Sequence, residues 1–223
     1  MSAYKIADII MDIRPRQLET VRFLAPYAIE ADCSDVSIEQ PADAEDELVG
    51  LFRRISQVLL YRFDGMYLHS VALEYRKKVY LFVAPPGTGK STHAALWKKK
   101  LGDRVRILNG DKPLLRRQQD QILVYGNPWQ GKEGWGENAS GVLAGIYFLR
   151  RSDRNYVLPI TPGEAVADLV HATEYPQDAE GVHKLLDFLE RITAHTRLNV
   201  LYCTPEAAAV DAVLADIERG DVL

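Results

Sequence analysis

Val79-Tyr80-Leu81-Phe82-Val83-Ala84-Pro85-Pro86-Gly87-Thr88-Gly89-Lys90-Ser91-Thr92 joins an apolar run to a glycine-rich turn. The apolar run predicts a buried strand, and residues 90–100 after the turn predict a helix. Residues 84–91 follow the phosphate-loop pattern of a glycine, four residues and Gly-Lys-Ser, with Ala84 in place of the first glycine. Because a strand precedes this turn and a helix follows it, as the motif requires, we predict a site for nucleotide phosphates.

Each residue type in the turn has a physical task. Gly87 and Gly89 can adopt backbone angles that expose successive N–H groups to an anion. Lys90 adds a positive charge between the β- and γ-phosphates, and the Ser91 hydroxyl can ligate Mg²⁺. The helix directs the positive end of its dipole at the same phosphates. We therefore expect ATP and Mg²⁺ as cofactors. The residues predicted to bind the nucleotide are Pro86, Gly87, Thr88, Gly89, Lys90, Ser91 and Thr92.

The composition limits the classes of partner. The chain has 223 residues, 47% of them hydrophobic, and is long enough to bury a substantial core. The 27 basic and 31 acidic side chains argue against nucleic acid or a membrane surface as the main partner. Cys33 and Cys203 form no metal-binding spacing, so we expect two reduced thiols. No run approaches eighteen apolar residues, and the N-terminus lacks the pattern of a signal peptide. We expect a cytoplasmic protein.

The first 65 residues differ in character from the rest. Residues 4–13 have strand-like content, and residues 29–47 are acidic and rich in turn formers. Leu48, Phe52 and Ile55 recur at helical spacing and predict a helix over about residues 46–62. We predict two domains, an α+β N-terminal subdomain over residues 1–65 and an α/β domain over residues 66–223.

The larger domain alternates between strand and helix patterns. Strands are expected over residues 68–75, 79–83, 104–108, 121–125, 142–149 and 198–203. Thr161 and Glu164 form a capping-box pattern that predicts the start of a helix. A second helical pattern covers residues 182–192, and Thr204 is expected to open the last helix.

A carboxylate follows the third of these strands, at Asp111. Phosphoryl transfer needs a carboxylate that holds the metal or accepts the proton of the nucleophile. His69, on the strand before the phosphate loop, could hold or move a proton there. A histidine on an apolar strand is as readily a core residue, and both interpretations stay open.

Residues 68–73, the phosphate loop and Asn109-Gly110-Asp111 together resemble the catalytic domain of the HPr serine kinase/phosphorylase family. This family shares its core with ATP-dependent phosphoenolpyruvate carboxykinase. The resemblance is closer to the smaller HPr-kinase-like proteins of bacteria, some of which modify lasso peptides, and Gly126-Asn127-Pro128-Trp129 matches their glycine-small-Pro-Trp segment. It covers about residues 68–151 and implies an α/β fold. The expected P-loop core is of the HPr kinase/PEP carboxykinase type, a mixed sheet with flanking helices, beside the small N-terminal appendage.

The resemblance also implies roles for single residues. The predicted catalytic residues are Asp111, His69 and Lys90, and the predicted metal ligands are Ser91 and Asp111. The family has two adjacent aspartates where this chain has Gly110 and Asp111. Asp111 then has to serve both metal and nucleophile, or Glu133 or Glu137 supplies the missing carboxylate.

Residues 126–138 contain four glycines and two tryptophans around charged and amide side chains. This composition suits a lid or an acceptor contact, and it also suits an ordinary surface loop. Arg150, at the end of a strand, could neutralise transition-state charge or be a solvated side chain. The residues predicted for the lid or the acceptor are Lys132, Glu133, Glu137, Asn138 and Arg150.

These features predict a Mg²⁺-dependent kinase that transfers the terminal phosphoryl group of ATP to a hydroxyl. The acceptor is expected to be serine or threonine of a peptide or small protein, recognised with help from residues 1–65. Two alternatives stay open: a kinase of a small metabolite such as an amino acid or sugar, and a regulatory module that binds ATP without turnover. We expect no nucleic-acid or membrane partner, and homo-oligomerisation is left open.

Overall fold

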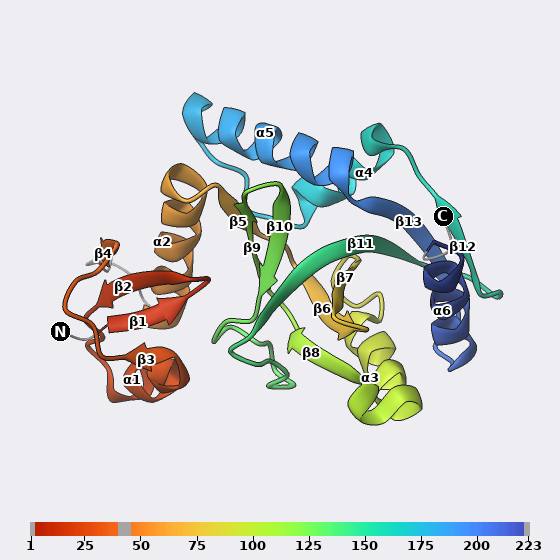
Figure 1. The fold of residues 1–223 in the computed structure, drawn as a ribbon, viewed down its shortest axis with the longest axis horizontal. Helices are drawn as coiled ribbons and strands as arrows, with labels where there is room; N and C mark the ends of the chain where they lie inside the picture. The colour runs from red at the N-terminus through yellow and green to blue at the C-terminus, as the bar shows by residue number, and fades with distance from the viewer. Residues whose placement is uncertain (1–2, 40–45, 221–223) are drawn as a thin grey trace.

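The computed structural model describes residues 3–39 and 46–220, which form two β-sheets with flanking helices (Figure 1). The strands are β1 (Ala3–Ile6), β2 (Ile9–Ile13), β3 (Ala28–Ile29), β4 (Val36–Ile38), β5 (Gly65–Tyr67), β6 (Ser70–Tyr75), β7 (Lys78–Val83), β8 (Val105–Asn109), β9 (Leu114–Gln118), β10 (Gln121–Tyr125), β11 (Ser140–Arg151), β12 (Tyr156–Pro159) and β13 (Arg197–Cys203). The helices are α1 (Leu18–Leu24), α2 (Glu47–Arg62), α3 (Lys90–Leu101), α4 (Pro162–His171), α5 (Ala179–His195) and α6 (Ala208–Gly220), with short 3₁₀ helices η1 (Ala25–Tyr27) and η2 (Gly102–Arg104).

The larger sheet has nine strands and is mixed. Its order is β5-β9-β10-β11-β7-β6-β8, and β13 with β12 joins it beside β11. The long strand β11 runs parallel to β7 along one edge. Along its other edge it pairs first with β10 and then, in parallel, with β13. This shared strand curves through the molecule in Figure 1 and joins the parallel and antiparallel parts of the sheet.

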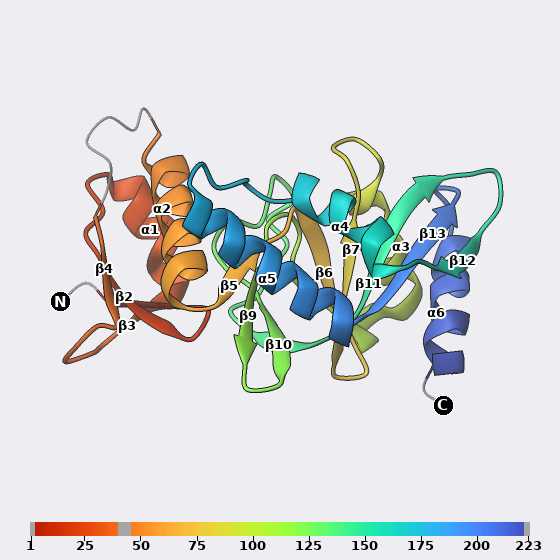
Figure 2. The ribbon, with the colours of Figure 1, turned by 90° about the horizontal axis from the view of Figure 1, so that it is seen from above.

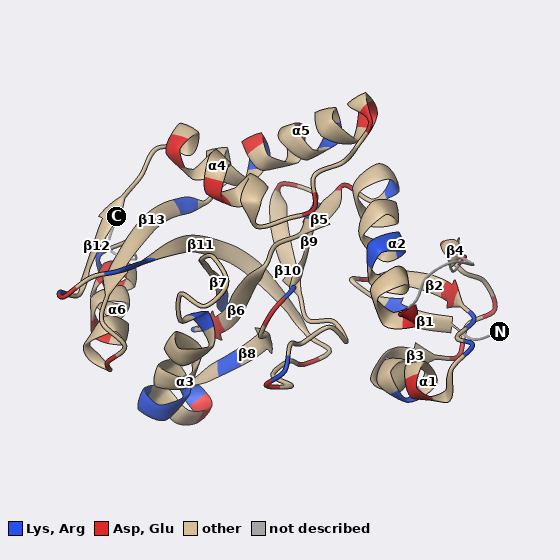
Figure 3. Cartoon of the chain, turned by 180° about the vertical axis from the view of Figure 1, so that it is seen from behind, with Lys and Arg blue, Asp and Glu red and all other residues tan. Residues whose placement is uncertain are grey.

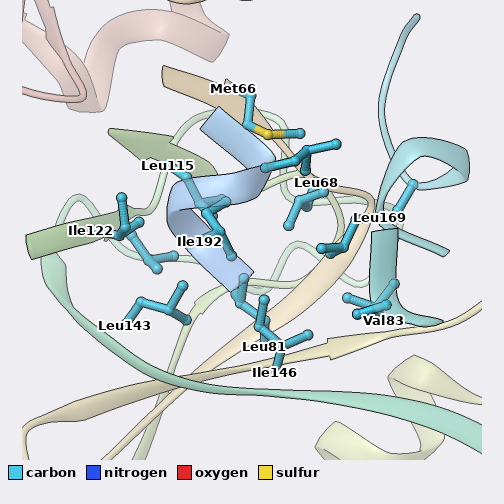
Figure 4. Packing of buried hydrophobic residues seen from close by; sticks show 14 of the residues in the cluster. Met66, Leu68, Leu81, Val83, Leu115, Ile122, Leu143, Ile146, Leu169 and Ile192 are labelled. Atoms are coloured by element: carbon cyan, nitrogen blue, oxygen red, sulfur yellow. The ribbon is translucent and has the colours of Figure 1, made fainter. Parts of the chain in front are cut away.

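Helices cover both faces of this sheet, and strand alternation divides the core between them. On β7, Leu81 and Val83 pack in a core with residues of α4 and α5. Tyr80 and Phe82, which alternate with these residues along β7, pack on the opposite side with residues of α3 and α6. Figure 2 shows α5 lying across the sheet, and Figure 4 shows part of the core beneath it. The mixed sheet with flanking helices agrees with the predicted fold class.

The N-terminal part forms a second sheet of four strands, in the order β3-β1-β2-β4. Its core extends into α2, where Leu51, Ile55 and Leu59 are buried. The same core includes Leu114 of β9 and Tyr125 of β10, which belong to the larger sheet. Through α2 and these two residues the N-terminal sheet packs against the rest of the chain.

The predicted helix over residues 46–62 is confirmed as α2, with Asp46 as its N-cap accepting from two backbone N–H groups. The capping box before α4 is also confirmed, since Thr161 and Glu164 bond reciprocally. The last helix begins at Ala208 rather than at Thr204. Thr204 is held outside it because its backbone N–H donates to the Asn155 side chain at 2.9 Å. In the described residues no helix is long and apolar enough to cross a membrane.

Candidate functional site

The phosphate loop connects β7, in the middle of the larger sheet, to α3. Gly87 and Gly89 have positive φ angles of 76° and 117°, and Gly89 is the N-cap of α3. A Cβ atom at either position would meet nothing within 4 Å. The backbone angles, and not a lack of space, therefore favour glycine at both positions. The turn is closed by a bond from the Thr88 N–H to the Pro85 carbonyl at 3.2 Å.

Lys90 closes the loop from inside. Its ammonium group donates to the Ala84 carbonyl at 2.7 Å, so the side chain links the two ends of the loop. The residue is 8% exposed, and burial lowers the pKa of Lys90, an effect that the nearby Asp111 carboxylate opposes. A buried cation bonded to one neutral carbonyl remains available to an anion that enters the loop.

Two cavities open beside the loop. One of about 470 Å³ is lined by residues 87–89, Thr92 and the ends of β11 and β13, including Leu149 and Cys203. The other, of about 460 Å³, lies over Pro85 and Pro86 and is lined by both arginines at the end of β11. The sequence analysis missed Leu149 and Cys203 as lining residues. Only their position at the ends of parallel strands, where α/β folds place ligands, could have indicated them.

Arg150 and Arg151 lie on the phosphate-loop side of the molecule. Arg150 forms an ion pair with Asp168 of α4, and Arg151 donates to the Gly87 carbonyl of the loop. We expected Arg150 to contribute to a lid or acceptor contact. Arg150 pairs with Asp168 and lines the cavity over the loop, and Arg151 is the arginine that touches the loop backbone.

Asp111 and His69, predicted separately, meet in the structure. His69 Nε2 lies 2.9 Å from Asp111 Oδ1, and both side chains are about two-thirds covered. The hydrogen bond from His69 lowers the pKa of Asp111, while burial opposes this shift and Lys112 and Lys90 add to it. The Asp111 carboxylate is therefore ionised at neutral pH and lies within electrostatic range of Lys90.

A buried asparagine, which the sequence analysis assigned no role, holds this aspartate in place. Asn109 is fully buried, and its Oδ1 accepts from the backbone N–H groups of Asp111 at 2.9 Å and Lys112 at 2.7 Å. Its Nδ2 donates to the carbonyls of Asn127 and Trp129. Asn109 thus ties the Asp111 turn to residues 126–129. An asparagine two positions before the predicted aspartate, a residue type that bonds nearby backbone in turns, was the available signal.

Residues 126–138 pack directly on this turn. A Cβ at Gly110 would lie 3.0 Å from the Gln130 carbonyl and 3.2 Å from that of Trp135, so no aspartate fits there without movement. A Cβ at Gly131 would lie within 4 Å of both Asp111 and Glu133. Gly131 therefore packs against the Asp111 side chain, where a larger residue would crowd it.

The other residues predicted in this segment point elsewhere. Glu137 forms an ion pair with Arg106 of β8 at 3.5 Å, and Asn138 donates to the Pro26 carbonyl at 3.1 Å. Lys132 is exposed on the turn that the Gly134 N–H closes to the Gly131 carbonyl at 3.2 Å. Glu137 thus anchors the segment to β8, and Asn138 anchors it to the N-terminal part.

The described residues contain no cluster of three or more His, Cys, Asp or Glu side chains that could hold a metal. Mg²⁺ beside nucleotide phosphates needs only one or two protein oxygens, because phosphates and waters complete its shell. Ser91 at the start of α3 and the ionised Asp111 are oxygen ligands of the type that this ion prefers. The residues present therefore fit Mg²⁺.

No family model and no curated protein matches the chain. Among solved structures, the HPr(Ser) kinase/phosphatase from Coxiella burnetii is similar with a TM-score of 0.37 and 12% identity, over 70% of this chain and 95% of that chain. This is a distant similarity at the level of the fold.

Proposed function

We propose that the protein is a Mg²⁺-dependent kinase that transfers the γ-phosphoryl group of ATP to a hydroxyl. The observation that carries this proposal is the Asp111–His69 pair, with its 2.9 Å contact, within electrostatic range of Lys90 in the phosphate loop. A cation for the phosphates and an ionised carboxylate for the acceptor are the two protein groups that phosphoryl transfer requires.

In the transfer, the acceptor oxygen attacks the γ-phosphorus from the side opposite the leaving group. The bond from phosphorus to the β–γ bridging oxygen breaks, and ADP leaves with that electron pair. The proton of the acceptor hydroxyl passes to the Asp111–His69 pair. Lys90, the loop N–H groups and Arg151 hold the phosphates in line. Bound Mg²⁺, with Ser91 and Asp111 as its ligands, would neutralise charge on the phosphates.

Two classes of acceptor fit this chemistry. The first is a serine or threonine hydroxyl of a peptide or small protein, recognised in part by the N-terminal residues 1–65 ahead of a catalytic domain over residues 66–223. The second is a small metabolite. A cavity of about 470 Å³ between α2 and residues 173–178 favours this second class, because it has the size of a small-molecule site.

The function is tested by two measurements on the full chain, calorimetric binding of Mg-ATP and release of phosphate or phosphorylated product from labelled ATP. Lys90→Ala should lose at least tenfold in ATP affinity, since about 1.4 kcal/mol is tenfold and a charged hydrogen bond contributes more. Asp111→Asn should bind ATP and lose transfer by about a hundredfold or more.

Arg154→Gln is the control. Arg154 is exposed in the turn after β11, and its substitution removes one positive charge, as a substitution of Lys90 does. Its binding and turnover should match the wild type. Absence of heat from Mg-ATP in the wild type would refute nucleotide binding. Binding without any turnover over a wide acceptor panel would favour the regulatory module instead.

A further inference from the structure

A cavity of about 470 Å³ lies outside the phosphate loop, between α2, β5 and residues 173–178. Arg54, Gln57, Val58, Tyr61 and Arg62 of α2 line it. These positions follow the i, i+3, i+4, i+7, i+8 spacing of one helix face, so the cavity extends along two turns of α2, roughly 12 Å. Figure 2 shows α2 beside the segment that leads into α5.

Two chain segments lead from the wall of this cavity to the Asp111–His69 pair. Tyr67 lines the cavity and stands two residues before His69 in the chain. Thr173, another lining residue, directly follows Ala172, whose carbonyl accepts from the His69 backbone N–H at 2.6 Å. Consecutive Cα atoms are about 3.8 Å apart, so both chain segments connect the cavity with the pair over one or two residues.

The acidic side chains of the cavity wall already have partners. Glu174 pairs with Arg53 at 3.4 Å, and Asp178 accepts from the Tyr61 hydroxyl and from the N–H of Gly181 at the start of α5. Glu174 is thus paired with a cation, whereas Asp178 is held by neutral donors and keeps its negative charge.

The two arginines of the cavity wall, Arg54 and Arg62, are not paired with a carboxylate in the described residues. Arg54 contacts only a neutral amide, Gln57 Oε1 at 3.4 Å, and Arg62 lies over the Phe63 ring at 5.6 Å. Neither has a carboxylate partner among residues 3–39 and 46–220. Figure 3 shows basic residues recurring along α2. The charges of Arg54 and Arg62 together exceed the single negative charge of Asp178, so the cavity wall offers a net positive charge to a ligand.

We infer that this cavity binds the phosphoryl acceptor, and that the acceptor is a small hydroxy acid whose carboxylate is held by Arg54 and Arg62. Its hydroxyl then reaches Asp111 past Tyr67. The assignment rests on the proposed kinase function and places the acceptor along α2 instead of against residues 126–138. A free acid is favoured over a peptide because the cavity has the volume of one small molecule and aromatic side chains, Tyr61 and Tyr175, at its wall.

The test measures binding and phosphorylation of matched probes in the presence of Mg-ATP or its non-hydrolysable analogue. N-acetyl-L-serine carries a hydroxyl and a carboxylate, and N-acetyl-L-serinamide differs only in lacking the charge. An acidic serine peptide, Ac-Glu-Ser-Glu-amide, with its Gln-Ser-Gln counterpart, forms the second arm. The proteins are wild type, the double variant Arg54→Gln/Arg62→Gln and the control Arg154→Gln.

The wild type and the control should favour the free acid over its amide by about tenfold, and the double variant should bring this ratio close to one. Mg-ATP affinity should stay within about twofold in all three proteins. Equal binding of acid and amide, no binding of either, or an unchanged ratio in the double variant would overturn the assignment. Selection of the acidic peptide alone would overturn the small-molecule class. In each case intact ATP binding, lost in Lys90→Ala, leaves the kinase proposal standing.

Discussion

At the scale of single residues, the side-chain amide of Asn109 fixes the position of the Asp111 turn. Its two side-chain atoms take part in four hydrogen bonds that join the Asp111 turn to residues 126–129. Because the residue is fully buried, no water can substitute for these bonds without rearrangement. Asn109 is therefore a positioning residue for Asp111.

Asn109→Ala should lower the free energy of unfolding by about 2–3 kcal/mol, since several buried polar groups lose their partner. Transfer should fall while ATP affinity changes little, because the phosphate loop does not contact this side chain. Urea unfolding and calorimetry provide the two measurements. Asn138→Ala is the control, as its exposed side chain makes one bond to the Pro26 carbonyl and should cost less than about 0.5 kcal/mol. Equal losses in the two variants would contradict the assigned role.

His93 makes stability depend on pH. It is 3% exposed, and its Nε2 accepts from the Trp97 indole at 2.9 Å, so this nitrogen must be unprotonated. Burial lowers the pKa of His93 to about 4, against about 6.5 in the unfolded chain. Between these values the unfolded chain binds the proton more readily, so the free energy of unfolding falls as the pH is lowered through this window.

We expect this residue to account for about 2 kcal/mol of stability lost between pH 7 and pH 5. The measurement compares urea unfolding of the wild type and His93→Gln at the two pH values. The variant should lose less on acidification, because glutamine can accept from Trp97 without titrating. His183→Gln, a change on the exposed face of α5, should keep the full loss. A loss in His93→Gln as large as in the wild type would refute the prediction.

At the scale of elements, the phosphate loop depends on backbone angles and not on side-chain volume. Gly89 caps α3 at φ 117°, and open space surrounds the position of its missing Cβ. Gly163, in the first turn of α4, also has open space but no positive φ. The two glycines therefore differ in conformation alone, which makes them a matched pair.

Gly89→Ala should destabilise the protein by about 1–2 kcal/mol and weaken ATP binding, because alanine disfavours that backbone conformation. Gly163→Ala should be neutral or stabilising by up to about 1 kcal/mol, since alanine favours a helix. Thermal unfolding with and without Mg-ATP measures both effects. Comparable destabilisation by the two changes would contradict the prediction that the φ angle sets the cost of replacing Gly89.

At the scale of the whole molecule, the two sheets share a core. Trp129 packs edge-on against Phe23 of α1 and close to Phe52 of α2, and its indole donates to the Leu48 carbonyl at 3.1 Å. Leu114 and Tyr125 of the larger sheet lie in the same apolar cluster. These contacts favour unfolding of both sheets in one transition.

Tryptophan fluorescence and far-UV circular dichroism should therefore give coincident urea transitions for the wild type. Trp129→Ala should lower the free energy of unfolding by about 3 kcal/mol and separate the two transitions, because it removes the ring that joins the sheets. Two separate transitions in the wild type would contradict a shared core.

The sequence by itself determined the features that depend on neighbours a few positions away. The unit β7–loop–α3, the Asp46 cap of α2 and the capping box at Thr161 follow from local patterns of apolar, glycine and capping residues. The sequence did not predict β5, β9 or β12. Strand β9 carries Arg116 and Arg117, and two adjacent charges are atypical of a strand in a sheet. In the structure Arg117 pairs with Asp64, and Arg116 donates to the Ala7 carbonyl.

Only the tertiary structure decided which site residues meet. It brings His69 to Asp111, and it engages Glu137 with Arg106 and Arg150 with Asp168. Hydrogen bonds within a turn depend on consecutive residues, so they can be predicted from a local sequence pattern. His69 and Asp111 are 42 positions apart in the chain, and their contact depends on sheet order and tertiary packing, which no local pattern encodes.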